Sequence, residues 1–121
     1  MDKIKLKIIG MSYSQAQTGA YALILGEESG DRRIPIVIGG FEAQAIAIEL
    51  EDMKPARPLT HDLFKNFAQT FHIGLKEIII NKFSEGIFYA LLITEDAAGN
   101  TYEIDSRTSD AVALAIRFDC P

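Results

Sequence analysis

Hydrophobic residues recur along the chain with two different periods. Six segments alternate apolar and polar positions, which is the spacing of strands that bury one face: 3–11, 20–26, 32–39, 75–83, 86–95 and 100–105. Helical spacing appears over 41–53, 60–72 and 108–118. The pattern predicts an α+β fold in the order βββα, α, βββα, with a mixed or antiparallel sheet.

This order is doubled because two parts of the chain resemble each other. Residues 21–49 align without a gap on residues 89–117, and nine of the 29 positions are identical. Such a fixed register predicts two pseudo-repeated βββα units, with the helix near 60–72 as an additional linking helix. The alignment sets Glu42 opposite Asp110 and Glu49 opposite Arg117.

Glu42 and Glu49 form an acidic pair on the first predicted helix. Seven residues separate them, so they project within about 20° of each other, beside apolar Ala45 and Ile46. A carboxylate set among apolar groups needs a partner, because burying an unpaired charge is costly. An arginine, a metal ion or water could each be that partner.

The segment 58–63 has the features of a helix entrance. Thr60 is a candidate N-cap, and Asp62 places a negative charge in the first turn. Capping does not explain His61, which beside an aspartate could ligate a metal or transfer a proton. The helix that follows is predicted to bury an apolar stripe made of Leu63, Phe64, Phe67 and Phe71.

A second polar segment runs from a strand into the last helix, over residues 104–111. Three of its hydroxyl residues are credible caps: Ser106, Thr108 and Ser109. Arg107 and Asp110 have the spacing of a pair on one helical turn, and Arg117 continues the same stripe. One interpretation is an ion-pair network that fixes the last helix against Glu42 or Glu49; the other is a functional site.

Composition restricts the choice of partners. The 121 residues, 48% of them hydrophobic, predict one domain over 1–121, and no long apolar run predicts a membrane span or signal peptide. With Cys120 as the only cysteine, a disulfide within the chain is excluded, and we expect a cytoplasmic protein. The net charge of −5 means that any nucleic-acid binding must be local or metal-assisted.

One basic stripe stands out against this acidic background. Lys3, Lys5 and Lys7 alternate with apolar residues and so share one face of a strand. The stripe is interpreted as a solvated face or a protected sheet edge, with phosphate binding as the alternative.

Several blocks of the sequence resemble the bifunctional nuclease domain family. They are Ile36-Val37-Ile38-Gly39, Glu42-Ala43, Leu50-Glu51, Arg57-Pro58-Leu59-Thr60-His61-Asp62-Leu63 and Asp105-Ser106-Arg107-Thr108-Ser109-Asp110-Ala111. The resemblance implies an α+β domain, association into dimers or larger homo-oligomers, and a nuclease activity toward DNA and RNA that some plant members show. Thr108 stands where the family often has proline, and the chain ends at Pro121 where relatives commonly continue.

The resemblance leads to a nuclease hypothesis with named residues. Acidic residues would hold Mg²⁺ or Mn²⁺, which activates water and neutralises the phosphate. The candidate metal ligands are Glu42, Glu49, Asp105 and Asp110; the candidate catalytic residues are His61, Asp62, Asp105, Arg107 and Asp110; and the candidate substrate-binding residues are Arg57, Arg107 and Ser109. The alternative is a non-catalytic dimeric module, or a small-ligand-binding module, in which the same charges order an interface.

Overall fold

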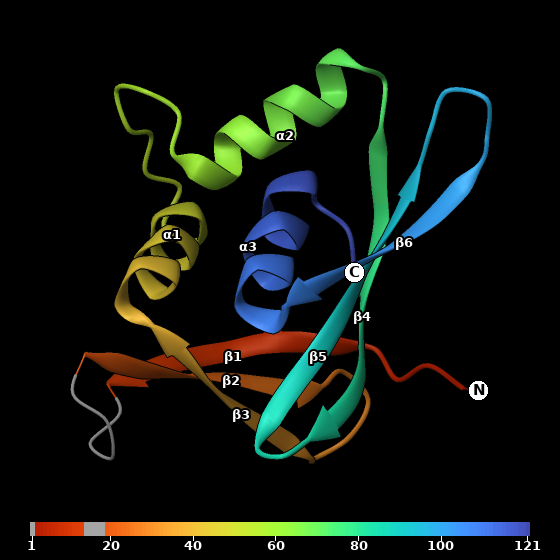
Figure 1. Ribbon diagram of the computed structural model, residues 1–121. Helices are drawn as coiled ribbons and strands as arrows, with labels where there is room; N and C mark the ends of the chain where they lie inside the picture. Colours follow the sequence, from red (N-terminus) through yellow and green to blue (C-terminus); the bar gives the residue numbers. More distant parts are fainter. Residues whose placement is uncertain (1, 14–18) are drawn as a thin grey trace. The chain divides into compact units, whose positions relative to one another are not determined.

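The computed structural model describes residues 2–13 and 19–121. Its elements follow the predicted order: β1 (Leu6–Tyr13), β2 (Ala20–Glu27), β3 (Arg33–Gly39), α1 (Gly40–Leu50), α2 (Thr60–Thr70), β4 (Gly74–Ser84), β5 (Ile87–Glu95), β6 (Thr101–Arg107) and α3 (Thr108–Phe118). This confirms the α+β class with βββα-like units (Figure 1). The chain forms two compact units, Met1–Gln44 and Ala45–Pro121.

The first unit is built around a three-stranded sheet in the order β1-β2-β3, with antiparallel pairing throughout. Alternate residues of β2 and β3 are buried, among them Leu23, Leu25, Ile36 and Ile38. β1 is an edge strand and begins later than predicted, so Lys7 is the one residue of the basic stripe that lies in it.

The second unit stacks a sheet and two helices. Its strands pair antiparallel in the order β4-β5-β6, and the β4–β5 hairpin turns on Glu85 and Gly86, both with positive φ as a tight two-residue turn requires. α3 packs against all three strands and against α2 (Figure 1). Ala90 and Leu92 of β5 meet Ala111 and Leu114 of α3 in the core. The alanines of α3 let the helix approach the sheet closely.

The internal repeat is visible in the element boundaries. β3 and α1 correspond residue for residue to β6 and α3 when Tyr21 is aligned with Tyr89. The first strand of each unit carries a bulge at nearly the same place, between Ile8 and Gly10 in β1 and between Leu75 and Glu77 in β4.

The two repeats differ by one residue in strand register. Tyr21 pairs with Ile38, whereas Tyr89 pairs with Arg107 rather than with the aligned Ser106. The hairpin loops carry the same difference. In the first, the Glu27 carboxylate accepts from Arg32, and in the second the Asp96 carboxylate, one aligned position later, accepts from the backbone of Ala98 and Asn100. The carboxylate that accepts hydrogen bonds in each turn is therefore shifted by one position, as the strand register is.

The predicted apolar stripe of α2 lies in solvent, so its predicted burial is wrong. Leu63, Phe64, Phe67 and Phe71 are 46% to 64% exposed, and the buried residue of this helix is Ala68. The reason is geometric, because α2 contacts α3 through the opposite face. Helical spacing identifies an apolar face of a helix, but it does not show whether another element packs on that face.

The expected caps are also wrong. Leu59 is the N-cap of α2, Thr60 is already helical, and the Asp62 carboxylate accepts the Leu59 backbone N–H at 2.9 Å. Arg107 is the N-cap of α3, while the buried Thr108 hydroxyl donates to the Phe88 carbonyl oxygen at 3.1 Å. At α2 the acceptor is thus a side chain three residues into the helix, whereas the Thr108 hydroxyl at the start of α3 bonds to the backbone of β5 and caps no helix N–H.

Arg117 is the most deeply buried charge of the second unit, with a side chain only 2% exposed. Its Nε donates to Asp62 Oδ1 at 2.8 Å, Nη1 donates to the Ala113 carbonyl at 3.0 Å, and Nη2 donates to the Ala45 carbonyl at 2.9 Å. One guanidinium thus joins α3, α2 and the last part of α1. An ion pair does fix the last helix, but Arg117 makes it with Asp62 of α2, whereas the sequence suggested Glu42 or Glu49 as the partner.

None of the helices in the described part of the chain has the length and apolar character that a membrane crossing requires.

We predict that Arg117→Ala destabilises the protein strongly, by about 3–5 kcal/mol, because it leaves the part-buried Asp62 charge and two carbonyl oxygens without their donor. The free energy of unfolding from urea titration measures this. Arg32→Ala is the matched control, because Arg32 makes a bidentate pair with Glu27 on an exposed surface and should change stability little. Equal effects of the two substitutions would contradict the structural role of Arg117.

Candidate functional site

The N-termini of α2 and α3 meet through three polar side chains. His61 Nε2 lies 2.9 Å from Asp110 Oδ1, and Arg107 Nε donates to Asp110 Oδ2 at 2.8 Å. β6 ends at Arg107 and α3 begins at Thr108, so Arg107 and Asp110 flank the first turn of α3. Together with Asp62 and Arg117, these side chains form what we call the entrance network.

Asp110 is held ionised by this arrangement. Burial alone would raise the pKa of Asp110, but the hydrogen bonds from Arg107 and His61 outweigh it and keep that pKa below its ordinary value of 3.8. Asp62 behaves similarly. Burial would raise the pKa of Asp62, but the hydrogen bonds from the Leu59 N–H and the Arg117 guanidinium outweigh it, so this pKa lies below its ordinary value of 3.8. Both carboxylates therefore carry full negative charge at neutral pH.

The pairing with Asp110 fixes the orientation of His61. Its Nε2 is engaged by the carboxylate, which leaves Nδ1 as the ring nitrogen available for proton transfer. The His61 side chain is 14% exposed, so solvent reaches part of the ring. A histidine oriented by an ionised aspartate is the arrangement that general-base catalysis uses, because the carboxylate stabilises the imidazolium that forms.

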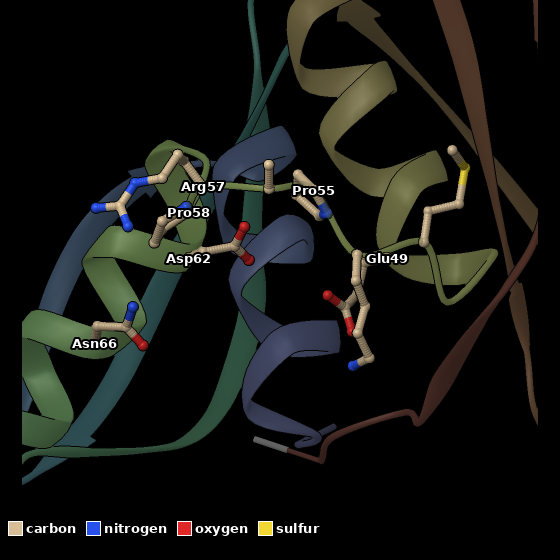
Figure 2. A pocket seen from close by; sticks show the side chains of 9 residues that line it. Glu49, Pro55, Arg57, Pro58, Asp62 and Asn66 are labelled. Atoms are coloured by element: carbon tan, nitrogen blue, oxygen red, sulfur yellow. The ribbon is translucent and has the colours of Figure 1, made fainter.

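A pocket of about 370 Å³ opens beside Asp62. It is lined by Glu49, the connecting segment Met53–Pro58, and Asp62 and Asn66 of α2. Figure 2 shows the Glu49 carboxylate and the Arg57 guanidinium on opposite sides of Asp62. The lining therefore combines both signs of charge, with Lys54 and Arg57 as the cations.

The entrance network differs from the equivalent place in the first repeat. Arg107 and Asp110 align with Gly39 and Glu42 of the first repeat. There the Glu42 carboxylate folds back over Gly39, where an added Cβ would come within 2.8 Å of it. The second repeat keeps the acid at the start of the helix and places an arginine at the position that the first repeat leaves without a side chain.

The structure brings together some of the residues that the sequence singled out. His61 and Arg107 are both hydrogen-bonded to Asp110, Asp62 is paired with Arg117, and Arg57 and Glu49 line the pocket. Others lie elsewhere. Asp105 is exposed in β6, Ser109 is buried, and Glu42 belongs to the other compact unit.

The predicted metal site finds little support in these side chains. Among residues 2–13 and 19–121, no three His, Cys, Asp or Glu residues are grouped as a metal-ligand set. Both oxygens of Asp110 are already bonded to His61 and Arg107, so this carboxylate is a poor ligand. The four proposed ligands do not fit the cation as a set, and the metal stays a prediction.

Sequence reasoning missed two pocket residues, Lys54 and Asn66. The signal for Lys54 was present, because Lys54 and Arg57 each stand directly before one of the two prolines that break the chain after α1. Asn66 could be placed only after the orientation of α2 was known.

Cys120 offers no reactive thiol. Burial, followed by the charges of Asp119 and Glu77, raises the pKa of Cys120 to about 11. The thiol is therefore protonated at neutral pH and is neither a nucleophile nor a ready metal ligand.

The lowered pKa of Asp110 predicts how stability depends on pH. Its contribution is complete above its ordinary pKa of 3.8 and is lost as the pH falls through the lower value of the folded state. Asp110→Asn should therefore reduce the free energy of unfolding by about 1.5–3 kcal/mol at pH 7, with the difference from the native chain shrinking toward pH 3 and below.

Denaturant titrations across this pH range test the expectation. Asp105→Asn is the control, because Asp105 is an exposed carboxylate of the adjoining strand. A loss for Asp110→Asn that is independent of pH would show that the charge of Asp110 is not responsible.

Comparison with known proteins identifies the family. Residues 23–121 match the bifunctional nuclease domain. Two uncharacterized proteins of Mycobacterium tuberculosis, from strains CDC 1551 / Oshkosh and ATCC 25618 / H37Rv, are each 39% identical to this chain over 117 residues, covering 97% of this chain and 68% of theirs. The match includes β2 to α3 and the whole entrance network, and the chain belongs to the bifunctional nuclease domain family.

Proposed function

We propose that this protein hydrolyses phosphodiester bonds of DNA or RNA at the entrance network. The family name supports a nuclease-like function. The observation that carries the proposal is the contact of His61 and Arg107 with the same carboxylate, at 2.9 and 2.8 Å. This contact supports the proposal because a proton acceptor and a phosphate-binding cation held by one carboxylate could act on the same scissile group.

Each side chain has a role that its position allows. His61 takes a proton from a water molecule as that water attacks phosphorus, and Asp110 stabilises the resulting imidazolium. The pentacovalent phosphate then collapses with loss of the leaving alkoxide, which takes up a proton from solvent water, and the His61 imidazolium returns its own proton to solvent. Arg107, 67% exposed, offers a planar guanidinium to the phosphate oxygens from the solvent side.

Substrate binding is proposed to be local rather than a property of the whole surface. The net charge of −5 repels a polyanion, so attraction must come from cations near the site. Lys54 and Arg57 beside the pocket can neutralise flanking phosphates. The predicted Mg²⁺ or Mn²⁺ would have to be held by Asp105 or Glu49, because both oxygens of Asp110 are already bonded. The single free cysteine agrees with the cytoplasmic location that we propose.

A second function is favoured by a different observation. In the described part of the chain, no buried side-chain nitrogen or oxygen lacks a hydrogen-bond partner, and both carboxylate oxygens of Asp62 and of Asp110 are already bonded. A network satisfied in this way suits a non-catalytic module, acting as a homodimer or higher oligomer, in which the charges order the fold. Activity measurements decide between these functions.

We predict that His61→Ala lowers the initial rate of cleavage by about a hundredfold or more, because it removes the proton acceptor. Single-stranded DNA and RNA oligonucleotides, labelled and incubated with highly purified protein, provide the measurement, with Mg²⁺, with Mn²⁺ and with a chelator. Asp105→Asn should lower only the metal-dependent rate if Asp105 is a ligand.

The matched control is His72→Ala, because His72 lies exposed at the other end of α2 and outside the network. Melting temperatures of all variants are followed in parallel, since His61 also contributes to the packing of α2 on α3. Folded His61→Ala protein that cleaves at the native rate, or absence of cleavage by the native protein in every condition, would rule out the enzyme and leave the structural module.

A further inference from the structure

The outer face of α2 carries an apolar stripe that the fold leaves exposed. Leu63, Phe64, Phe67 and Phe71 lie within about one third of the helix circumference, and the rings of Phe67 and Phe71 pack at 5.0 Å between centroids. At the roughly 150–250 Å² that a large side chain can bury, the exposed fractions correspond to about 400–500 Å² of apolar surface. We propose that this stripe binds the same stripe of a second copy of this chain, so that two α2 helices form the centre of a symmetric dimer.

The exposed apolar area of the stripe fits the centre of an interface with a second protein chain. A standard interface buries about 800 Å² from each partner, with an apolar centre inside a polar rim. The stripe supplies about half of that area, which suits the centre. The polar neighbour Thr70, which is exposed, can supply part of the rim.

The distribution of charge favours a second copy of this chain over a nucleic acid as the partner of the stripe. Two copies with a net charge of −5 repel each other, so their contact must lie where the surface is locally neutral. The stripe contains no charged residue, and Asp62 lies on a different side of α2, paired with Arg117. A nucleic acid stacked on these rings would need cations beside them, and in α2 the lysine at position 65 is half-buried on the opposite face.

The pocket remains open in such a dimer. Asp62 and Asn66, which line it, project about 130° away from the centre of the stripe around the helix axis. Association and cleavage are therefore separable, and the inference does not depend on nuclease activity.

Two substitutions on α2 test the dimer. Phe67→Glu places a charge at the centre of the stripe, where twofold symmetry brings it opposite its own copy, and it should raise the dimer dissociation constant at least about thirtyfold. Gln69→Glu adds the same charge to an exposed position on another face of the helix and should leave association unchanged. Light scattering and sedimentation equilibrium of the full chain, from about 1 to 100 μM, give the constants.

The expected result is a dimer for the native chain and for Gln69→Glu, and a folded monomer for Phe67→Glu. Far-ultraviolet circular dichroism and the melting temperature show that each variant is folded. Phe71→Ser provides a second variant in case Phe67→Glu fails to fold. A native chain that stays monomeric, or a Phe67→Glu dimer as tight as the native one, overturns the proposal. A monomer that binds anionic vesicles or single-stranded DNA through this stripe would overturn it in favour of those ligands.

Discussion

The second unit depends on how one buried guanidinium is satisfied. The Arg117 guanidinium has only N–H donors and no acceptor, so its burial requires acceptors inside the protein. The acceptors come from three helices: the Ala45 carbonyl in α1, the Ala113 carbonyl in α3 and the Asp62 carboxylate in α2. Their positions fix where α2 begins relative to α3, and this in turn determines that His61, the residue before Asp62, meets Asp110.

The two halves of the repeat have matching elements but different polar side chains. The repeat keeps strand and helix boundaries because the apolar positions of the two halves coincide, but it changes the polar residues at equivalent places. Glu49 of the first repeat aligns with Arg117, and Gly39 aligns with Arg107. Each change introduces a cation into the second repeat, and each cation then binds an aspartate near the start of a helix. The two repeats therefore share a fold, and the second repeat carries two arginines at positions where the first repeat has none.

The sequence predicted the elements well because their periodic patterns are local. The boundaries of β6 and α3 differ from the expected ones by at most two residues, since alternation and the i,i+3 and i,i+4 pattern extend to their ends. Long-range partners were harder to predict. The partner of Arg117 is 55 positions away in the sequence, and the choice of Asp62 over Glu42 or Glu49 depends on how α2 crosses α3. The exposure of the phenylalanine stripe was missed for the same reason: helical spacing identifies an apolar face but does not show whether another element packs against it.

α2 is the element with no counterpart in the repeat, and it contributes to every candidate function. Its inner face supplies His61 and Asp62 to the entrance network, a second side lines the pocket with Asp62 and Asn66, and its outer face presents the phenylalanine stripe. A helix that joins two repeated units is not required to match a partner element, so its faces can take on separate tasks. Because Asp62 both accepts from Leu59 at the start of α2 and pairs with Arg117, the orientation of the helix is set at its first turn. That turn therefore controls the direction of all three faces, and the geometry of the site and of the proposed interface depends on the same carboxylate.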